Sequence, residues 1–184
     1  MELLFFVSLY MRIDKLTSKL QSALADAQSL ALGKENNFIE PAHLLLSLIE
    51  QKGGSVKPLL AQVGFNLSDL RKQVQELVDN LPQVSDNGGE ITVSQDLSRL
   101  LNQADKLAQH KGDSFISGET VLLVAMNDKG AVGKLLNSSG VSLQALENAI
   151  VNLRGGESVD DSCAEDAWQA LSKYCIDVTE RAEN

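Results

Sequence analysis

Apolar residues recur every three or four positions along most of the chain, which is the spacing of amphipathic helices. The first such stripe consists of Ile13, Leu16, Leu20, Leu24, Ala27 and Ala31, and it ends at Gly33. Further stripes follow from Pro41 onwards, between Ser55 and Gly64, and from Asn66 to Leu81, and alternation of the strand type is nearly absent. The pattern therefore predicts an all-α fold.

This series of stripes occurs twice. The segment NNFIEPAHLLLSLI, residues 36–49, returns as DSFISGETVLLVAM, residues 113–126, at a shift of 77. The shared residues are Phe38, Ile39, Leu45 and Leu46 in the first copy and Phe115, Ile116, Leu122 and Leu123 in the second. The two stripes that follow recur at a shift of 76. The first stripe is Val56, Leu59, Leu60 and Gly64, and it returns as Val132, Leu135, Leu136 and Gly140. The second stripe is Leu67, Leu70, Val74 and Leu77, and it returns as Leu143, Leu146, Ile150 and Leu153. The chain thus carries a tandem duplication of a unit of about four helices.

The duplication divides the chain into five parts. They are an apolar extension (1–11), a first repeat (12–81), a linker rich in turn-forming residues (82–94), a second repeat (95–154) and an acidic, flexible segment (155–184). An isolated unit of about 70 residues would leave part of its apolar stripes exposed. We therefore expect two tandem pseudo-symmetric four-helix repeats packed as one globular domain, with a groove at their seam.

Several residues mark helix ends. Pro41 suits the first turn of a helix, and Ser117 takes the capping position in the second copy. Ser55 and Asn66 begin two further helices, and Gly155 suits the left-handed residue that ends the last one. The opening MELLFFVSLY is too short to span a bilayer and lacks the basic start of a signal peptide, so we interpret it as an extension before Met11, with a weak interfacial anchor as the alternative.

Charge and composition exclude several classes of function. The net charge is -9, and residues 157–184 contribute eight acids and two bases to it. No basic face exists for nucleic acid. The two cysteines, Cys163 and Cys175, form no CxxC pair, which favours reduced thiols in a cytoplasmic protein. His43 and His110 have no spaced partner, so no metal site is expected, and no nucleophile with its base can be assigned.

The duplicated unit resembles the Clp amino-terminal domain. The run from MRIDKLTSKLQSALADAQSLALG to RGGESVDDSCAEDAWQALSKYCIDVTERAEN resembles the start of ClpB-type disaggregases, and the likeness covers residues 11–184. In that family the tail leads into an ATPase module that uses ATP and magnesium. No GxxxxGK[ST] loop occurs in these residues, so we expect neither a cofactor nor enzymatic activity in this chain.

The resemblance also implies a substrate-binding surface. Thr17, Asp113 and Glu119 match positions that the family places there, and the alternative is that they only cap helices or turns. Leu16, Leu20, Leu101 and Leu107 are candidates for the apolar wall of such a groove, and the alternative is plain core packing. Gln103 and Thr120 stand where related chains often carry leucine, which makes the expected groove more polar.

Two functions fit these observations. The first is a substrate-docking domain that weakly binds exposed apolar segments of unfolded or aggregated proteins and passes them to a hexameric ATP-driven chaperone. In this function we expect no membrane partner, and we expect the isolated domain to be a monomer. The alternative is a stand-alone module that binds an adaptor or regulates a Clp assembly.

If Thr17, Asp113 and Glu119 form a groove rim, alanine at each should lower the free energy of unfolding by only about 0.5–1 kcal/mol, against about 2–5 kcal/mol for the repeated leucines.

Overall fold

A computed structural model describes residues 13–85 and 91–166 of the chain. Its helices are α2 (Ser18–Gly33), α3 (Pro41–Glu50), α4 (Val56–Gln62), α5 (Leu67–Asp79), α6 (Gln95–His110), α7 (Gly118–Met126), α8 (Ala131–Ser138) and α9 (Leu143–Arg154). Two short strands, β1 (Phe38–Ile39) and β2 (Thr92–Val93), are also present. The predicted extension 1–11 and the tail beyond residue 166, with Cys175, lie outside the described residues.

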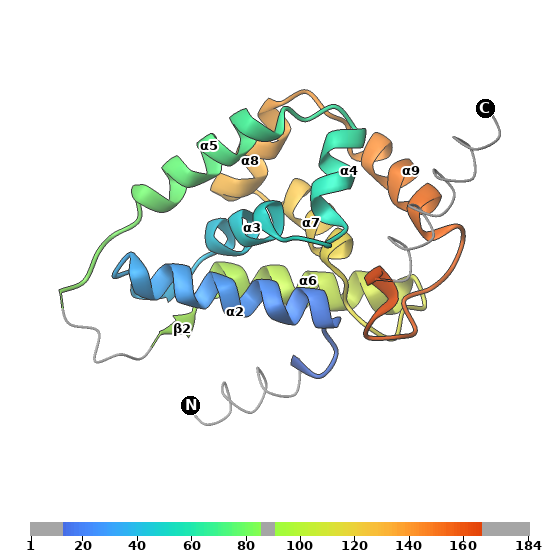
Figure 1. Ribbon diagram of the computed structural model, residues 1–184, viewed down its shortest axis with the longest axis horizontal. Coiled ribbons are helices and arrows are strands. Elements are labelled where there is room, and N and C mark those ends of the chain that lie inside the picture. The colour runs from blue at the N-terminus through green and yellow to red at the C-terminus, as the bar shows by residue number, and fades with distance from the viewer. Residues whose placement is uncertain (1–12, 86–90, 167–184) are drawn as a thin grey trace, which may run out of the picture.

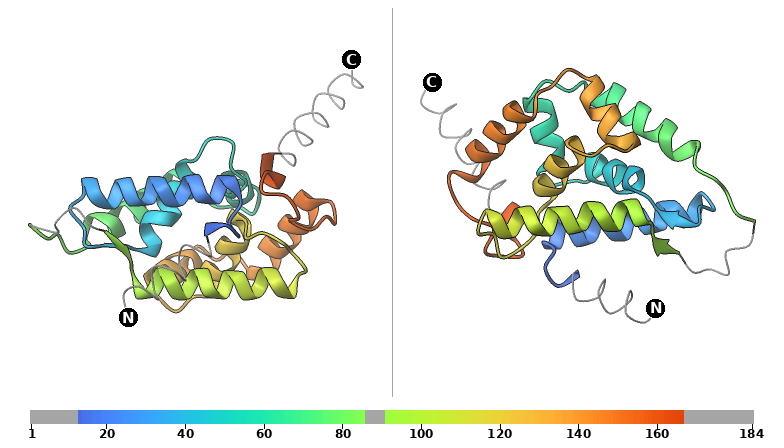
Figure 2. Two further views of the ribbon diagram at one scale, coloured as in Figure 1. Left: turned by 90° about the horizontal axis from the view of Figure 1, so that it is seen from below. Right: turned by 180° about the vertical axis from the view of Figure 1, so that it is seen from behind.

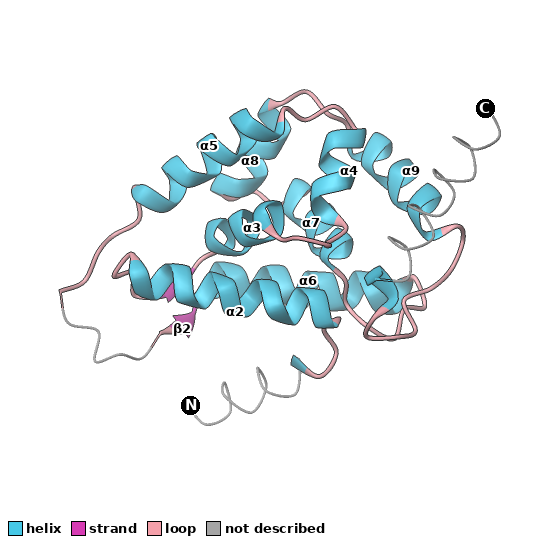
Figure 3. Ribbon diagram, in the orientation of Figure 1, coloured by secondary structure: helices cyan, strands magenta, loops and turns pink. Residues whose placement is uncertain are grey.

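The two predicted repeats are both present, with α2 to α5 forming one and α6 to α9 the other. Figures 1 and 3 show the two helical repeats packed against each other as one body. Seen from below, α2 and α6 lie on opposite outer faces, and α3 and α7 lie between them (Figure 2). The predicted all-α duplication is therefore confirmed.

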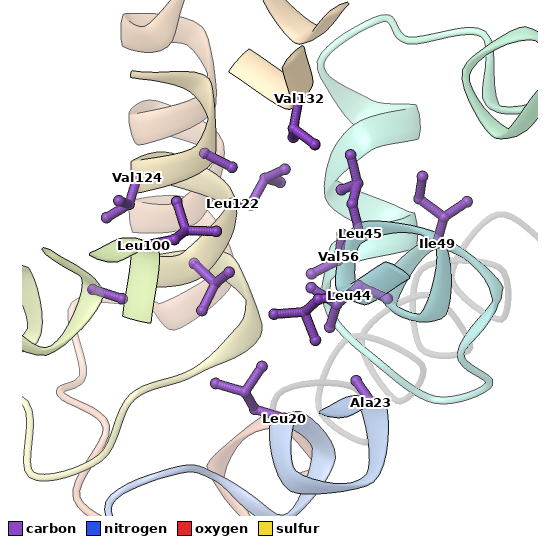
Figure 4. Close-up of a cluster of buried hydrophobic side chains, with 14 of the residues drawn as sticks. Leu20, Ala23, Leu44, Leu45, Ile49, Val56, Leu100, Leu122, Val124 and Val132 are labelled. Carbon is purple, nitrogen blue, oxygen red and sulfur yellow. The ribbon is translucent and has the colours of Figure 1, made fainter. Parts of the chain in front are cut away.

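The core lies where α3 and α7 meet the flanking helices. Both helices are apolar on almost every side, and all nine residues of α7 are buried. Figure 4 shows side chains of both repeats in one cluster, with Leu45 of α3 and Leu122 of α7 among them. The four leucines that recur between the copies, Leu45, Leu46, Leu122 and Leu123, are at most 4% exposed, so the prediction that they are core residues is confirmed.

The repeats exchange short backbone pairings. Ile39 of β1 pairs in parallel with Val93 of β2, and Ile116 pairs in parallel with Leu16. A shift of 77 relates Ile39 to Ile116 and Leu16 to Val93. In each copy, the residue just before the first helix therefore pairs with the other copy. The sequence pattern did not reveal these pairings, because two residues are too few to show alternation.

Most predicted helix ends are observed. Glu40 is the N-cap of α3 with Pro41 in its first turn, and the side chain of Asn66 accepts a hydrogen bond from the Asp69 N–H. Gly155 follows α9 in the left-handed conformation, with φ of 61°. Helix α2 begins at Ser18, where Thr17 caps it, so Ile13 and Leu16 of the predicted first stripe precede this helix.

His43 is a buried structural residue, as expected for a histidine without metal-binding partners. Its side chain is fully buried in α3, where Nδ1 accepts a hydrogen bond from the Glu40 N–H and Nε2 lies 2.9 Å from Asn36 Oδ1. Nδ1 can accept only without a proton, so Nε2 donates to Asn36. Burial lowers the pKa of His43 to about 4.

We predict that His43 makes the fold acid-sensitive. Its pKa is depressed on folding, so its stabilising contribution is present above an unfolded pKa of about 6.5 and is lost as the pH falls towards 4. Between pH 7 and 4.5 the free energy of unfolding should fall by about 2–3 kcal/mol more in the wild type than in His43→Gln. Urea unfolding of both proteins at the two pH values measures the difference. An equal loss of unfolding free energy in the two proteins would contradict the acid sensitivity assigned to His43.

Candidate functional site

Arg154 organises a buried cluster of polar side chains at the end of α9. Its Nη1 lies 3.0 Å from Asp113 Oδ2, and its Nη2 lies 2.9 Å from Glu119 Oε1. The same Nη2 donates to the hydroxyls of Ser117 and Thr120 at 3.3 and 3.2 Å. The planar guanidinium thereby connects the loop before α7 with the first turn of that helix.

The carboxylates of this cluster have further partners. Ser55 at the start of α4 donates to Glu119 Oε2 at 3.0 Å, and Asp113 Oδ1 accepts the N–H of Val159 at 3.0 Å. The cluster therefore joins elements of both repeats to the segment that follows α9. We call residues 157–166 the strap. In Figure 1 this orange-to-red segment returns towards the start of α2 and the loop between α6 and α7.

Glu165 of the strap is the fourth ionisable group at this site. It is 2% exposed, and its Oε1 accepts hydrogen bonds from Thr17 Oγ1 and from the Gly118 N–H, both at 2.9 Å. Burial, and next the charge of Glu119, raise the pKa of Glu165 to about 7. Docking of this side chain is therefore least favourable when it is ionised, above that pKa.

The repeat symmetry explains why Glu165 occupies this place. Thr17 corresponds to Ser94 at a shift of 77, and both hydroxyls cap the first helix of their repeat. Burial raises the pKa of Glu40, and hydrogen bonding from Ser94 opposes this effect. Glu40 corresponds to Ser117, which has no carboxylate, and Glu165 supplies one to Thr17 from the strap.

The predicted site residues do not form one groove. Thr17, Asp113 and Glu119 do gather around Arg154 and Glu165, but they are buried, with exposures of 0%, 8% and 0%. In this arrangement none of the three lines an exposed rim, because the strap covers Thr17 and Asp113 while Glu119 is enclosed between Arg154 and Ser55. Their role in substrate binding stays a prediction.

The predicted apolar wall is also divided. Leu16, Leu20 and Leu101 are at most 4% exposed and belong to the core, so packing explains them. Thr120 is fully buried beside Arg154 and lines no surface. The fourth residue of the predicted wall, Leu107, lines a surface depression.

This depression is a groove of about 280 Å³ between α6, α7 and α9. Its apolar lining comes from Leu107, Leu123, Val124 and Leu143, and its polar lining from Gln103, Asn127 and Glu147. Leu107 and Leu143 are half-buried and Gln103 is exposed. Leu123 and Val124 are buried, so the groove exposes a mixed apolar and polar surface, which suits a short segment of another protein that carries both kinds of side chain.

Sequence reasoning missed Arg154 and Glu165 as site residues. The signal for Arg154 was a basic side chain at a helix end, in a chain whose candidate site residues included Asp113 and Glu119. No local signal marked Glu165, since its partners lie 148 and 47 residues away. Within 13–85 and 91–166 no cluster of metal-binding side chains occurs, and no helix there is both long and apolar enough to cross a membrane.

Comparisons with known proteins agree on one family. The model of the Clp repeat (R) N-terminal domain matches residues 15–139. The chaperone protein ClpB of Pseudomonas putida is 60% identical over 173 residues, which cover 94% of this chain and 20% of the relative. The chain thus spans about a fifth of the length of this curated relative.

Solved structures show the same fold. The N-terminal domain of Hsp104 from Candida albicans has a TM-score of 0.72 at 22% identity, over 82% of this chain and 99% of that domain. A complex of the ClpV N-domain with a VipB peptide has a TM-score of 0.63 at 20% identity, over 77% of this chain and 88% of that one.

Proposed function

The chain belongs to the Clp repeat (R) N-terminal domain family, and on this basis we propose that it is the substrate-docking N-terminal domain of a ClpB-type chaperone. In this proposal it weakly binds exposed apolar segments of unfolded or aggregated proteins. The observation that carries the proposal is the groove between α6, α7 and α9, which is lined by leucine and valine together with polar side chains. The ClpV N-domain seen with a peptide supports this type of binding for the fold.

In this proposal the chain captures the unfolded protein and takes no part in ATP hydrolysis. Six copies in a hexamer would raise the effective affinity while each contact stays weak and reversible. We place the protein in the cytoplasm, which fits the exposed free thiol of Cys163.

Gln103 offers a direct test, because it is an exposed polar side chain at the groove. We predict that Gln103→Leu binds an unfolded protein about three to ten times more tightly, since it adds apolar surface where a client segment would lie. Leu107→Ala should weaken binding by a similar factor. Binding of fluorescent, reduced and alkylated α-lactalbumin, followed by anisotropy, measures both effects.

Val151 supplies the matched control. It lies on α9 outside the groove and is 61% exposed, so Val151→Ala removes an exposed apolar side chain without changing the groove. Its binding should equal that of the wild type. If Gln103→Leu and Leu107→Ala also bind like the wild type, this groove is not the docking site. If no variant binds unfolded protein while a folded adaptor binds tightly, the chain is a regulatory module instead.

A further inference from the structure

The segment MELLFFVSLY, residues 1–10, is a run of apolar residues that precedes both repeats and belongs to neither. Eight of its ten residues are apolar, and its one charged residue is Glu2. Five apolar side chains, LLFFV, follow one another at residues 3–7. Such a run is unfavourable in water, so it gains free energy wherever the surface of a folded protein covers it.

The chain that follows this segment is fixed beside α6. The carbonyl of Ile13 accepts a hydrogen bond from Gln21 Nε2 at 3.0 Å. Lys15 Nζ lies 3.8 Å from Asp105 Oδ1 on α6. The chain therefore enters the described fold at the flank of α6 that carries Asp105.

The groove between α6, α7 and α9 opens on the other flank of the same helix. Successive helix residues are about 100° apart, so Gln103 and Leu107 each lie about 160° around the axis from Asp105. The outer face between the two flanks carries the exposed residues Lys106 and Gln109.

The distance between the two flanks is short for an extended chain. A helix with its side chains is about 10–12 Å across, so a path over its outer face takes about 15–20 Å. About five extended residues cover that path, at about 3.3–3.6 Å each. Residues 8–12 are enough to cross α6, which brings LLFFV to the groove.

The groove offers partners for both the side chains and the backbone of such a segment. Leu107 and Leu143 are half-buried and present apolar surface to its side chains. The amide side chains of Gln103 and Asn127 both donate and accept, which suits the N–H and C=O groups of an extended backbone. The Glu147 carboxylate accepts a further N–H. A mixed groove therefore suits an apolar segment whose backbone also needs partners.

We propose that residues 3–7 occupy this groove in their own chain and compete there with client segments. A short tether gives an effective concentration on the order of millimolar, so a contact with a Kd below that value keeps the groove occupied in most molecules. A client must displace the segment, and its apparent affinity falls with the fraction of molecules whose groove is open. This inference rests on the proposed function only in taking this groove as the client site.

Two variants remove the competitor in different ways. The first begins at Met11 and lacks residues 1–10. The second keeps the full length but carries serine at each of residues 3–7, so that the tether remains while the apolar side chains are lost. Leu9→Ser is the control, because it removes an apolar side chain from the part that crosses α6 and leaves LLFFV unchanged. Circular dichroism checks that all three proteins keep the helical fold.

The first measurement needs no client. The NMR signals of Gln103, Leu107 and Leu143 should differ between the full chain and both variants that lack LLFFV, whereas the Leu9→Ser protein should resemble the full chain. Identical groove signals in all four proteins would overturn the inference. Differences confined to Leu32 and Phe38, which are exposed apolar side chains outside the groove, would also overturn it. Groove signals that change with protein concentration would overturn the contact within one chain.

The second measurement is the affinity for reduced and alkylated α-lactalbumin. We expect the two variants that lack LLFFV to bind it about three to ten times more tightly than the full chain, because the groove is open in every molecule. Leu107→Ala should remove most of this difference, since it weakens the groove for the segment and the client alike.

The two measurements separate this inference from the proposed function. If the groove signals respond to LLFFV but no form binds α-lactalbumin, the inference stands and the proposed function fails. If every form binds α-lactalbumin with the same affinity through Gln103 and Leu107, the proposed function stands and the inference fails.

Discussion

Arg154→Ala is expected to lower the free energy of unfolding by about 3–5 kcal/mol, the largest effect of any charged residue described. The substitution leaves Asp113 and Glu119 buried without the cation that faces both of them. Desolvated carboxylates without a counter-charge are far more costly than exposed ones. Urea unfolding followed by circular dichroism at pH 7 gives the value.

Arg71→Ala is the matched control for this change. Arg71 also pairs with a carboxylate, at 2.7 Å from Glu50, but the two side chains are 61% and 44% exposed. An exposed pair contributes about 0–1 kcal/mol, so this variant should remain close to the wild type. A similar small loss for Arg154→Ala would show that the cluster is open to solvent in solution, against the burial described above.

Leu122→Ala is expected to cost about 2–5 kcal/mol, through lost burial and the cavity that remains. Leu122 is fully buried in α7, and Figure 4 shows it in a cluster with side chains of the other repeat. Leu32→Ala is the control, because Leu32 is 41% exposed on α2 and should cost no more than about 0.5 kcal/mol. Thermal unfolding of the two variants separates core from surface leucines, and equal losses would contradict the burial of Leu122.

The helical duplication could be predicted because the signal is repeated within the sequence itself. Leu45 and Leu122 occupy matching places in two copies of an apolar stripe, and each copy needs the other to cover it. Helix ends such as Pro41 and Gly155 could be predicted because their backbone preferences act locally.

The arrangement of the polar residues could not be predicted in the same way. Asp113 and Glu119 lie 41 and 35 residues before Arg154, and the fold alone brings the three together. The resemblance suggested a surface for Thr17 and Asp113, whereas the strap buries both. Because Asp113 and Glu119 are buried, alanine at either position should cost more than the about 0.5–1 kcal/mol expected for a groove rim. The reason is that removing one partner of a buried ion pair leaves the other partner buried without its counter-charge.

The most direct test of client docking is an NMR titration of the isotope-labelled chain with reduced and alkylated α-lactalbumin. If the groove between α6, α7 and α9 is the docking site, the signals of Gln103, Leu107 and Leu143 should shift progressively as the unfolded protein is added, while those of Arg71 and Gln75 on α5 stay in place. Shifts that spare the groove residues, or no shifts at saturating client, would contradict client docking in this groove.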